Sequence, residues 1–248
     1  MNISIQPLGG SWKREKILIV IGIALFYQCY LLLTFWTLSA TPIDVSLSWD
    51  HQWPLHAPWI LAYGMVYMSA ILPLFVLKDP LLFRYLGFAY LTVECISMIC
   101  FVIFPVHMFI RPEFTSIAPN TFFDWGIRLC YWVDHPTCCF PSLHVSMSFI
   151  AALCCSKVSR IVGGATILIA VLISLSTLFV KQHFIADVFG GLFLAGGSYL
   201  YWMRTAPTLY DQPKERVYAL KYAFIPCLIY IGIILTLYSL YWSGWVPN

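Results

Sequence analysis

Seven hydrophobic segments constrain the fold of this chain more than any other feature. They lie at about residues 17–39, 57–77, 81–105, 142–156, 161–180, 184–203 and 219–243. A helix needs about 20 apolar residues to cross a bilayer, and only the segment at 142–156 is clearly shorter. Charged residues make up 10% of the chain, against roughly 25% of a soluble domain. The sequence therefore predicts an all-α fold, a polytopic membrane helix bundle.

Basic residues divide the loops between these segments into two sets. All but three of the 14 lysines and arginines lie before the first segment or in the connections after the second, fourth and sixth. Cytoplasmic loops are enriched in Lys and Arg, so we expect a cytoplasmic N-terminus and a C-terminus on the other side. Arg111, Arg128 and Lys181 fall on that other side together with all six histidines. We expect this face to lie toward the periplasm, the exterior or an organelle lumen.

Two short motifs on this face begin the fourth and sixth segments. FPSLH occupies residues 140–144 and HFIAD occupies residues 183–187. The stretch between His144 and His183 is long enough for roughly two membrane crossings, so both histidines are expected at the same face. His183 and Asp187 are four residues apart and would share one face of a helix. The sequence therefore predicts two histidines and a carboxylate in one site.

These residue types suit phosphoryl transfer. A carboxylate bonded to one ring nitrogen of a histidine orients the ring and stabilises its charged form, and Asp187 is placed to do this for His183. His144 is suited to protonate a leaving group and later to activate water. Ser142 and the backbone amides that follow it can hold phosphate oxygens, as helix N-termini do.

The phosphate oxygens also need positive charge. Arg111 lies in the loop before the first motif, and Lys181 lies two residues before His183. Arg128 and His107 are further candidates for the same pocket. The sequence has no carboxylate cluster and no zinc-ligand spacing, so no metal or other cofactor is expected. The cysteines of this face at 130, 138 and 139 are compatible with a disulfide or with free thiols.

The order Arg-Pro, Pro-Ser-x-His and Ser-x(6)-His-x-x-x-Asp resembles the type 2 phosphatidic acid phosphatase superfamily over about residues 81–203. That resemblance implies a six-helix membrane core, to which this chain adds a seventh helix. It also implies a histidine nucleophile that becomes a phosphohistidine, an orienting carboxylate and a general acid. These roles fall on His183, Asp187 and His144, and the phosphate-binding roles fall on Arg111, Ser142 and Ser176.

Three positions depart from the common family pattern. Phe104 stands where the first motif usually has a lysine, and Thr177 stands where the third usually has an arginine. We expect Lys181 to replace one of these cations. Leu143 stands where many phosphatases of the family have glycine, and the resulting motif resembles the branch that contains inositol phosphorylceramide synthases. Leu143 is therefore included among the expected substrate-binding positions.

The sequence thus predicts one integral membrane domain over residues 1–248, with a catalytic core at about 55–203 and an added helix at 219–243. We expect a metal-independent lipid phosphatase that acts on a phosphomonoester or pyrophosphate at the non-cytoplasmic face. Its partners would be a lipid phosphate and the bilayer, with no nucleic acid. Phosphotransfer to an alcohol is an alternative, and a lipid transporter without chemistry is a third. The oligomeric state is left open.

Overall fold

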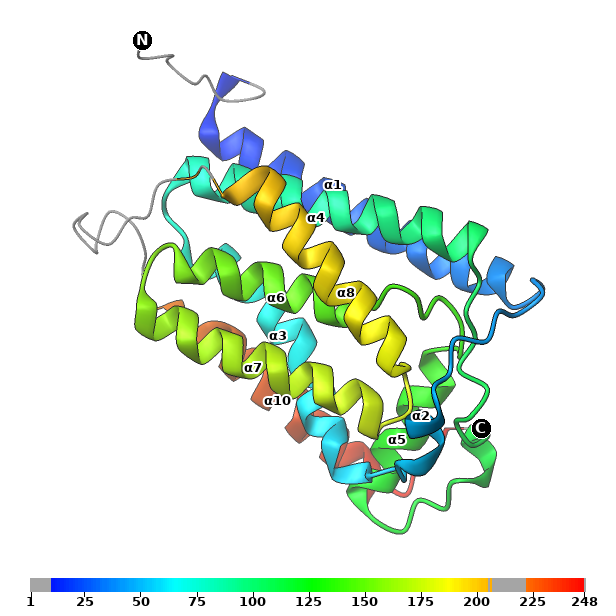
Figure 1. Cartoon of the computed structure of the whole chain (residues 1–248). Helices are drawn as coiled ribbons and strands as arrows, with labels where there is room; N and C mark the ends of the chain where they lie inside the picture. Colours follow the sequence, from blue (N-terminus) through cyan, green and yellow to red (C-terminus); the bar gives the residue numbers. More distant parts are fainter. Residues whose placement is uncertain (1–9, 205, 207–221, 248) are drawn as a thin grey trace.

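The protein is an elongated bundle of helices, seen in a computed structural model that describes residues 10–204, 206 and 222–247 (Figure 1). Seven helices follow the seven predicted segments: α1 (Trp12–Thr37), α3 (Ile60–Val76), α4 (Pro80–Ile103), α6 (Leu143–Ser156), α7 (Arg160–Phe179), α8 (Ile185–Ser198) and α10 (Phe224–Trp242). A π-helix, Tyr199–Met203, extends α8. The described residues form no β-strand. The predicted all-α class is therefore confirmed.

Five of these helices are long and apolar enough to span a membrane: α1, α3 with its preceding 3-10 turn, α4, α7 and α10. Helices α6 and α8 have 14 residues each, which is about 21 Å of helix. Helix α6 packs against α3, α4, α7 and α8, so it is the central helix of the bundle. Protein surrounds α6, which is why a helix with a polar first turn is stable there.

Polar side chains cap four of the seven helices that follow the predicted segments. The side chains of Ser11, Asp79, Ser142 and Ser159 accept a backbone N–H from the first turns of α1, α4, α6 and α7. Such caps satisfy amide groups that have no partner inside the helix. Successive helices run in opposite directions, so the connections gather at the two ends of the bundle (Figure 1).

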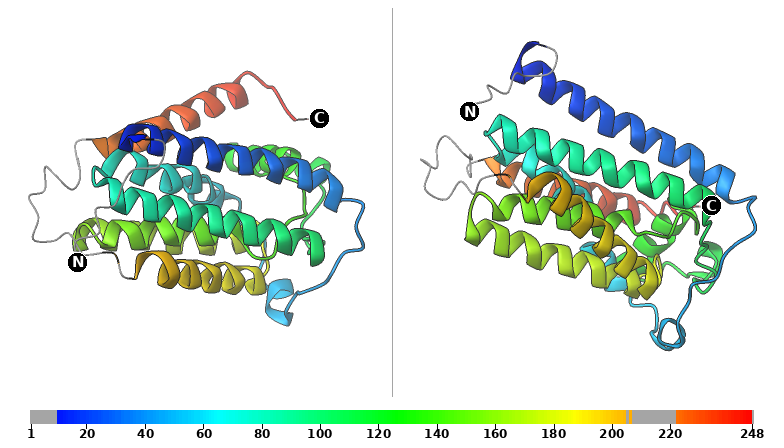
Figure 2. Two further views of the ribbon diagram at one scale, coloured as in Figure 1. Left: turned by 90° about the horizontal axis from the view of Figure 1, so that it is seen from above. Right: turned by 45° about the horizontal axis from the view of Figure 1, so that its top comes forward.

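The hydrophilic stretch at about 106–141 is folded over one of these ends. It contains a short 3-10 helix (Phe114–Ser116) and an unforeseen α-helix, α5 (Phe122–Val133), which buries Trp125, Ile127 and Tyr131. Helix α2 (Ser48–Gln52) lies at the same end, as two further views confirm (Figure 2). The residues that carry the sequence motifs lie beneath this covering.

Candidate active site

The turn between α7 and α8 presents the predicted nucleophile, His183. Its Nδ1 atom lies 3.4 Å from Oδ2 of Asp187, one helical turn further on. The same Oδ2 accepts the backbone N–H of Phe184 at 2.8 Å, so the carboxylate is held at the start of α8. Both side chains are buried. With Nδ1 directed at Asp187, the Nε2 atom is left to face the rest of the site.

His144, in the first turn of α6, lies against that Nε2 atom. The distance from His183 Nε2 to His144 Nδ1 is 3.3 Å, across 39 positions of the chain. The rings meet edge to face, with centroids 5.4 Å apart. This contact agrees with the expectation that the two crossings between His144 and His183 return both histidines to the same end of the bundle. Asp187, His183 and His144 therefore form a continuous chain of three side chains.

Ser142 ties α6 to α8 beside this chain. Its N–H donates to the backbone carbonyl of Asp187 at 3.1 Å, and its hydroxyl accepts the N–H of Val145 at 3.4 Å. A Cβ atom on Gly191 would lie 2.6 Å from the Ser142 carbonyl oxygen. Only a glycine allows α8 to approach α6 this closely, so the two motifs are held together by backbone contacts.

Arg111 reaches the same turn from the loop that follows α4. Its guanidinium donates to Oε1 of Gln182 at 3.0 Å and to the backbone carbonyls of Asp134 at 2.8 Å and Tyr131 at 3.3 Å. It also lies over the Tyr131 ring, 4.3 Å from the centroid. Gln182 immediately precedes His183, so this cation lies beside the turn that carries the predicted nucleophile.

Lys181 has a buried side chain whose amine is engaged elsewhere. Its Nζ donates to the backbone carbonyl of Asp50 in α2 at 2.7 Å, and the Asp50 carboxylate accepts the N–H of Ile185 at 2.9 Å. Burial lowers the pKa of Lys181 from its ordinary value, and the charge of Asp50 acts in the opposite direction. The backbone of Lys181 has a φ of 52°, in a region that few residues other than glycine adopt.

The other predicted phosphate-binding positions have structural partners. Ser176 is buried and donates its hydroxyl to the carbonyl of Ile173 at 2.6 Å. Leu143 packs against the largest core cluster. At the two positions where the family usually has a cation, Phe104 packs against the ring of Phe140, and Thr177 donates its hydroxyl to the carbonyl of Ser174. Phe104 and Thr177 therefore supply no positive charge for a phosphate.

The side chains of Arg128 and His107 bond to groups that lie away from His144 and His183. Arg128 donates its Nε–H to the carbonyl of Pro247 at 3.0 Å, which fastens the C-terminal segment to α5. The Nε2 atom of His107 lies 3.0 Å from the carbonyl of Thr37 at the end of α1. These contacts stabilise the covering end of the bundle, and the structure does not bring either side chain to His144 or His183.

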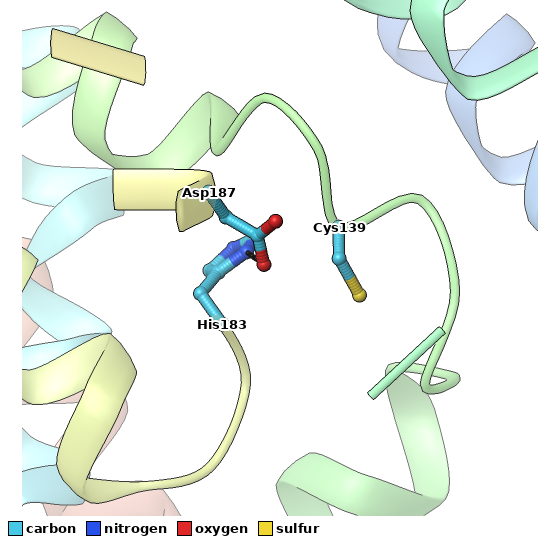
Figure 3. A group of neighbouring side chains, drawn as sticks. All are labelled: Cys139, His183 and Asp187. Atoms are coloured by element: carbon cyan, nitrogen blue, oxygen red, sulfur yellow. Dashed lines mark hydrogen bonds and ion pairs between the residues drawn. The ribbon is translucent and has the colours of Figure 1, made fainter. Parts of the chain in front are cut away.

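Cys139 is a neighbour that sequence reasoning did not place in the site. A ligand-type atom from each of Cys139, His183 and Asp187 lies within 4.8 Å of the others (Figure 3). Oδ1 of Asp187 is buried and has no hydrogen-bond partner among the described residues. All nine cysteines are free thiols, so the disulfide alternative is not realised. The one sequence signal was the position of Cys139, three residues before Ser142.

A known protein family matches the part of the chain that contains these site residues. The chain matches the PAP2 superfamily over residues 82–211, just over half of its length, which includes α4, α6, α7 and α8. The corresponding comparisons find no match among curated proteins and none among solved structures. The matched region contains Arg111, His144, His183 and Asp187. On this match, the chain belongs to the PAP2 superfamily.

Proposed function

We propose that the protein hydrolyses a phosphomonoester or pyrophosphate of a membrane lipid through a phosphohistidine at His183. The observation that carries the proposal is the chain from Asp187 to His183 to His144, with contacts of 3.4 Å and 3.3 Å. It places a carboxylate on one ring nitrogen of His183 and a second acid–base group on the other. The carboxylate can orient a neutral histidine nucleophile, and the second histidine can supply a proton to the leaving group.

In the first step, the lone pair on Nε2 of His183 attacks phosphorus and the bond from phosphorus to the lipid oxygen breaks. His144 gives its proton to that oxygen, and the lipid alcohol leaves. Asp187 accepts the hydrogen bond from Nδ1–H and stabilises the positive charge on the phosphorylated ring. Because the two rings are in contact, the phosphoryl group has to enter between them.

In the second step, water attacks phosphorus and the bond from phosphorus to Nε2 breaks. His144 now takes a proton from that water, which returns both histidines to their starting states and releases inorganic phosphate. Arg111 lies beside the turn that carries His183 and would hold phosphate oxygens together with the amides at the start of α6. Lys181 would contribute once its amine turns from the carbonyl of Asp50.

The site would face the non-cytoplasmic side. The basic residues Lys13, Arg14, Lys16, Lys78, Arg84, Lys157, Arg160 and Arg204 lie at the end of the bundle opposite the histidines, while Lys214, Arg216 and Lys221 fall outside the described residues. The positive-inside rule then puts the N-terminus in the cytoplasm. Reporter fusions to each terminus test this orientation, which requires the two ends to lie on opposite sides.

Transfer of the phosphoryl group or a phospho-headgroup to an alcohol is the second candidate. It is favoured by the burial of the site, since His183 is 6% exposed and Asp187 is fully buried. A site with little access for water suits a lipid alcohol as the attacking group. The same phosphoenzyme would serve both reactions.

The test is phosphate release from a panel of lipid phosphates by the purified protein in detergent with a chelator present. Wild type should release phosphate, and His183→Ala should lose activity by a factor on the order of 10⁶. His135→Ala is the matched control, because His135 lies at the same end of the bundle but packs against Phe35. Equal activity of wild type and His183→Ala would rule out the proposal.

His144 has a separate test. His144→Ala should lower turnover of a lipid phosphate by about 10²–10⁴-fold. It should slow the initial burst of p-nitrophenol from p-nitrophenyl phosphate much less, because that leaving group needs no proton and the burst precedes the attack of water. If no lipid yields phosphate, addition of acceptor alcohols tests transfer. Lipid transport that survives loss of both histidines would instead support the transporter reading.

A further inference from the structure

An apolar cavity of about 370 Å³ lies between α3, α5 and α10. This volume is within the range of about 300–1,000 Å³ that is usual for small-molecule sites. Apolar side chains such as Ile71, Leu129, Ile234 and Leu237 form most of its wall. Other lining residues, such as Tyr67 and Ile233, are about half exposed, so the cavity opens on the lipid-facing side of the bundle.

The inner end of the cavity is polar and adjoins the histidine pair. Tyr63 lines the cavity, and its ring centroid lies 4.7 Å from that of His144. The Tyr63 hydroxyl donates at 3.0 Å to Asp134, which also lines the cavity. The backbone carbonyl of Asp134 in turn accepts a hydrogen bond from Arg111. The cavity and the candidate active site therefore share a wall.

Helix α10 is fastened on both sides of this cavity. Near its start, the Tyr230 hydroxyl donates to the carbonyl of Leu61 in α3. Beyond its end, the carbonyl of Trp245 accepts the indole N–H of Trp125 in α5 at 2.8 Å. Between these two attachments, the helices enclose an apolar space. The added C-terminal helix thus completes a cavity that the other helices would leave open.

We propose that this cavity binds the hydrocarbon chain of the substrate lipid while its phosphate lies at His183. The proposal rests on the proposed function and names the substrate class as a long-chain lipid phosphate. The chain of such a lipid would pass Tyr63 and lie among apolar side chains, and its polar end would meet the histidines and Arg111. A small soluble phosphate ester would occupy only the polar part of the site.

The experiment compares two tryptophan variants of neighbouring residues in α10. Ile234 lines the cavity, whereas Leu235 does not line it and is 60% exposed on the outer face. Ile234→Trp should therefore fill the cavity, and Leu235→Trp adds the same side chain outside it. Phosphate release is measured with long-chain phosphatidic acid and with its water-soluble short-chain analogue.

Ile234→Trp should lower kcat/KM for the long-chain substrate by about tenfold or more and leave the short-chain value near that of wild type. Leu235→Trp should change neither. Equal values for the two variants on the long-chain substrate, with both folded, would overturn the proposal.

A second readout separates this proposal from the proposed function. A phosphatidic acid with a photoreactive chain should label peptides of α3, α5 and α10 in wild type, and Ile234→Trp should lose that labelling. Absence of phosphate release from every substrate would refute the function, while labelling confined to α3, α5 and α10 would still support the cavity. Labelling spread evenly over the lipid-facing helices would overturn it.

Discussion

The two ends of the helical bundle use their buried charges in different ways. At the cation-rich end, Arg84 forms a salt bridge with Glu15, and Lys157 donates to the carbonyl of Ala206 at 2.9 Å. These contacts join α1 to α4, and α6 to the segment after α8. At the other end, His183 contacts Asp187 and a second histidine, and one buried oxygen of Asp187 has no hydrogen-bond partner in the described part of the chain.

This difference distinguishes charged groups that stabilise the fold from titratable groups that can take part in catalysis. A charge bonded to a fixed partner stabilises one arrangement, and its removal leaves that partner buried and unsatisfied. Two titratable rings in contact can instead exchange a proton with a bound group. Substitutions at the cation-rich end should therefore change stability, whereas substitutions at the histidine end should change turnover.

After the loss of His183 itself, the largest effect on turnover is expected at Asp187. Asp187→Asn keeps the shape of the side chain but removes the charge that orients His183 and stabilises its positive form. Turnover of a lipid phosphate should fall by about 10⁴-fold, as it does when the orienting carboxylate of a catalytic triad is replaced. The measurement is kcat alongside the thermal midpoint in detergent. A large loss of stability with little change in kcat would place Asp187 with the structural charges.

Lys181 tests whether every charge at the histidine end affects turnover rather than stability. It lies near His183, yet its amine bonds to a backbone carbonyl as the charges at the other end do. If it replaces a missing family cation, Lys181→Met should lower kcat/KM by about 10²–10³-fold without unfolding the protein. Lys181→Arg should restore part of this loss. Near-wild-type turnover of Lys181→Met would rule out the role.

The corresponding change at the opposite end is Arg84→Ala. Glu15 is only 2% exposed and Arg84 12%, so the variant leaves a buried carboxylate without its salt bridge. The free energy of unfolding should fall by about 3–5 kcal/mol, with kcat unchanged at temperatures where the variant is folded. Lys13→Ala, in the same turn of α1 but exposed, should leave both quantities unchanged. A lower kcat in Arg84→Ala would contradict the division between the ends.

The parts of the molecule that could be predicted from sequence are those that the membrane and local spacing determine. The seven helices follow from the need to bury apolar runs, and the His183–Asp187 pair follows from the four-residue spacing of a helix. The partners of Arg111, Lys181 and Arg128 could not be predicted. Apart from the side chain of Gln182 at Arg111, these partners are backbone carbonyls of other segments, and the sequence does not show which carbonyl a side chain will reach. Helix α5 was missed because its 12 residues are too few to cross a membrane, and Asp124 and Arg128 interrupt its apolar residues.

Cys139 gives the smallest expected effect at the histidine end, where its thiol lies beside His183 and Asp187. Zinc binds Cys, His and carboxylate ligands together, and the three candidate atoms lie within 4.8 Å of one another. Small shifts of these side chains would bring them to zinc-ligand distances. A bound ion would occupy the nitrogen lone pair or the carboxylate that His183 needs. A chelator should therefore leave turnover unchanged, and added zinc should inhibit it.

The matched variants for this test are neighbours in the chain. Cys139→Ala removes one ligand and should raise the zinc concentration for half-inhibition by about tenfold or more, since even outer partners of a zinc site contribute about 10–100-fold to affinity. Cys138→Ala should leave that concentration unchanged, because the Cys138 thiol lies against the Thr37 hydroxyl at 3.4 Å. Equal sensitivity of both variants would mean that zinc acts elsewhere. A selective effect at Cys139 would show that the buried groups of the histidine end, unlike Arg84 and Glu15, can accept an external charged partner.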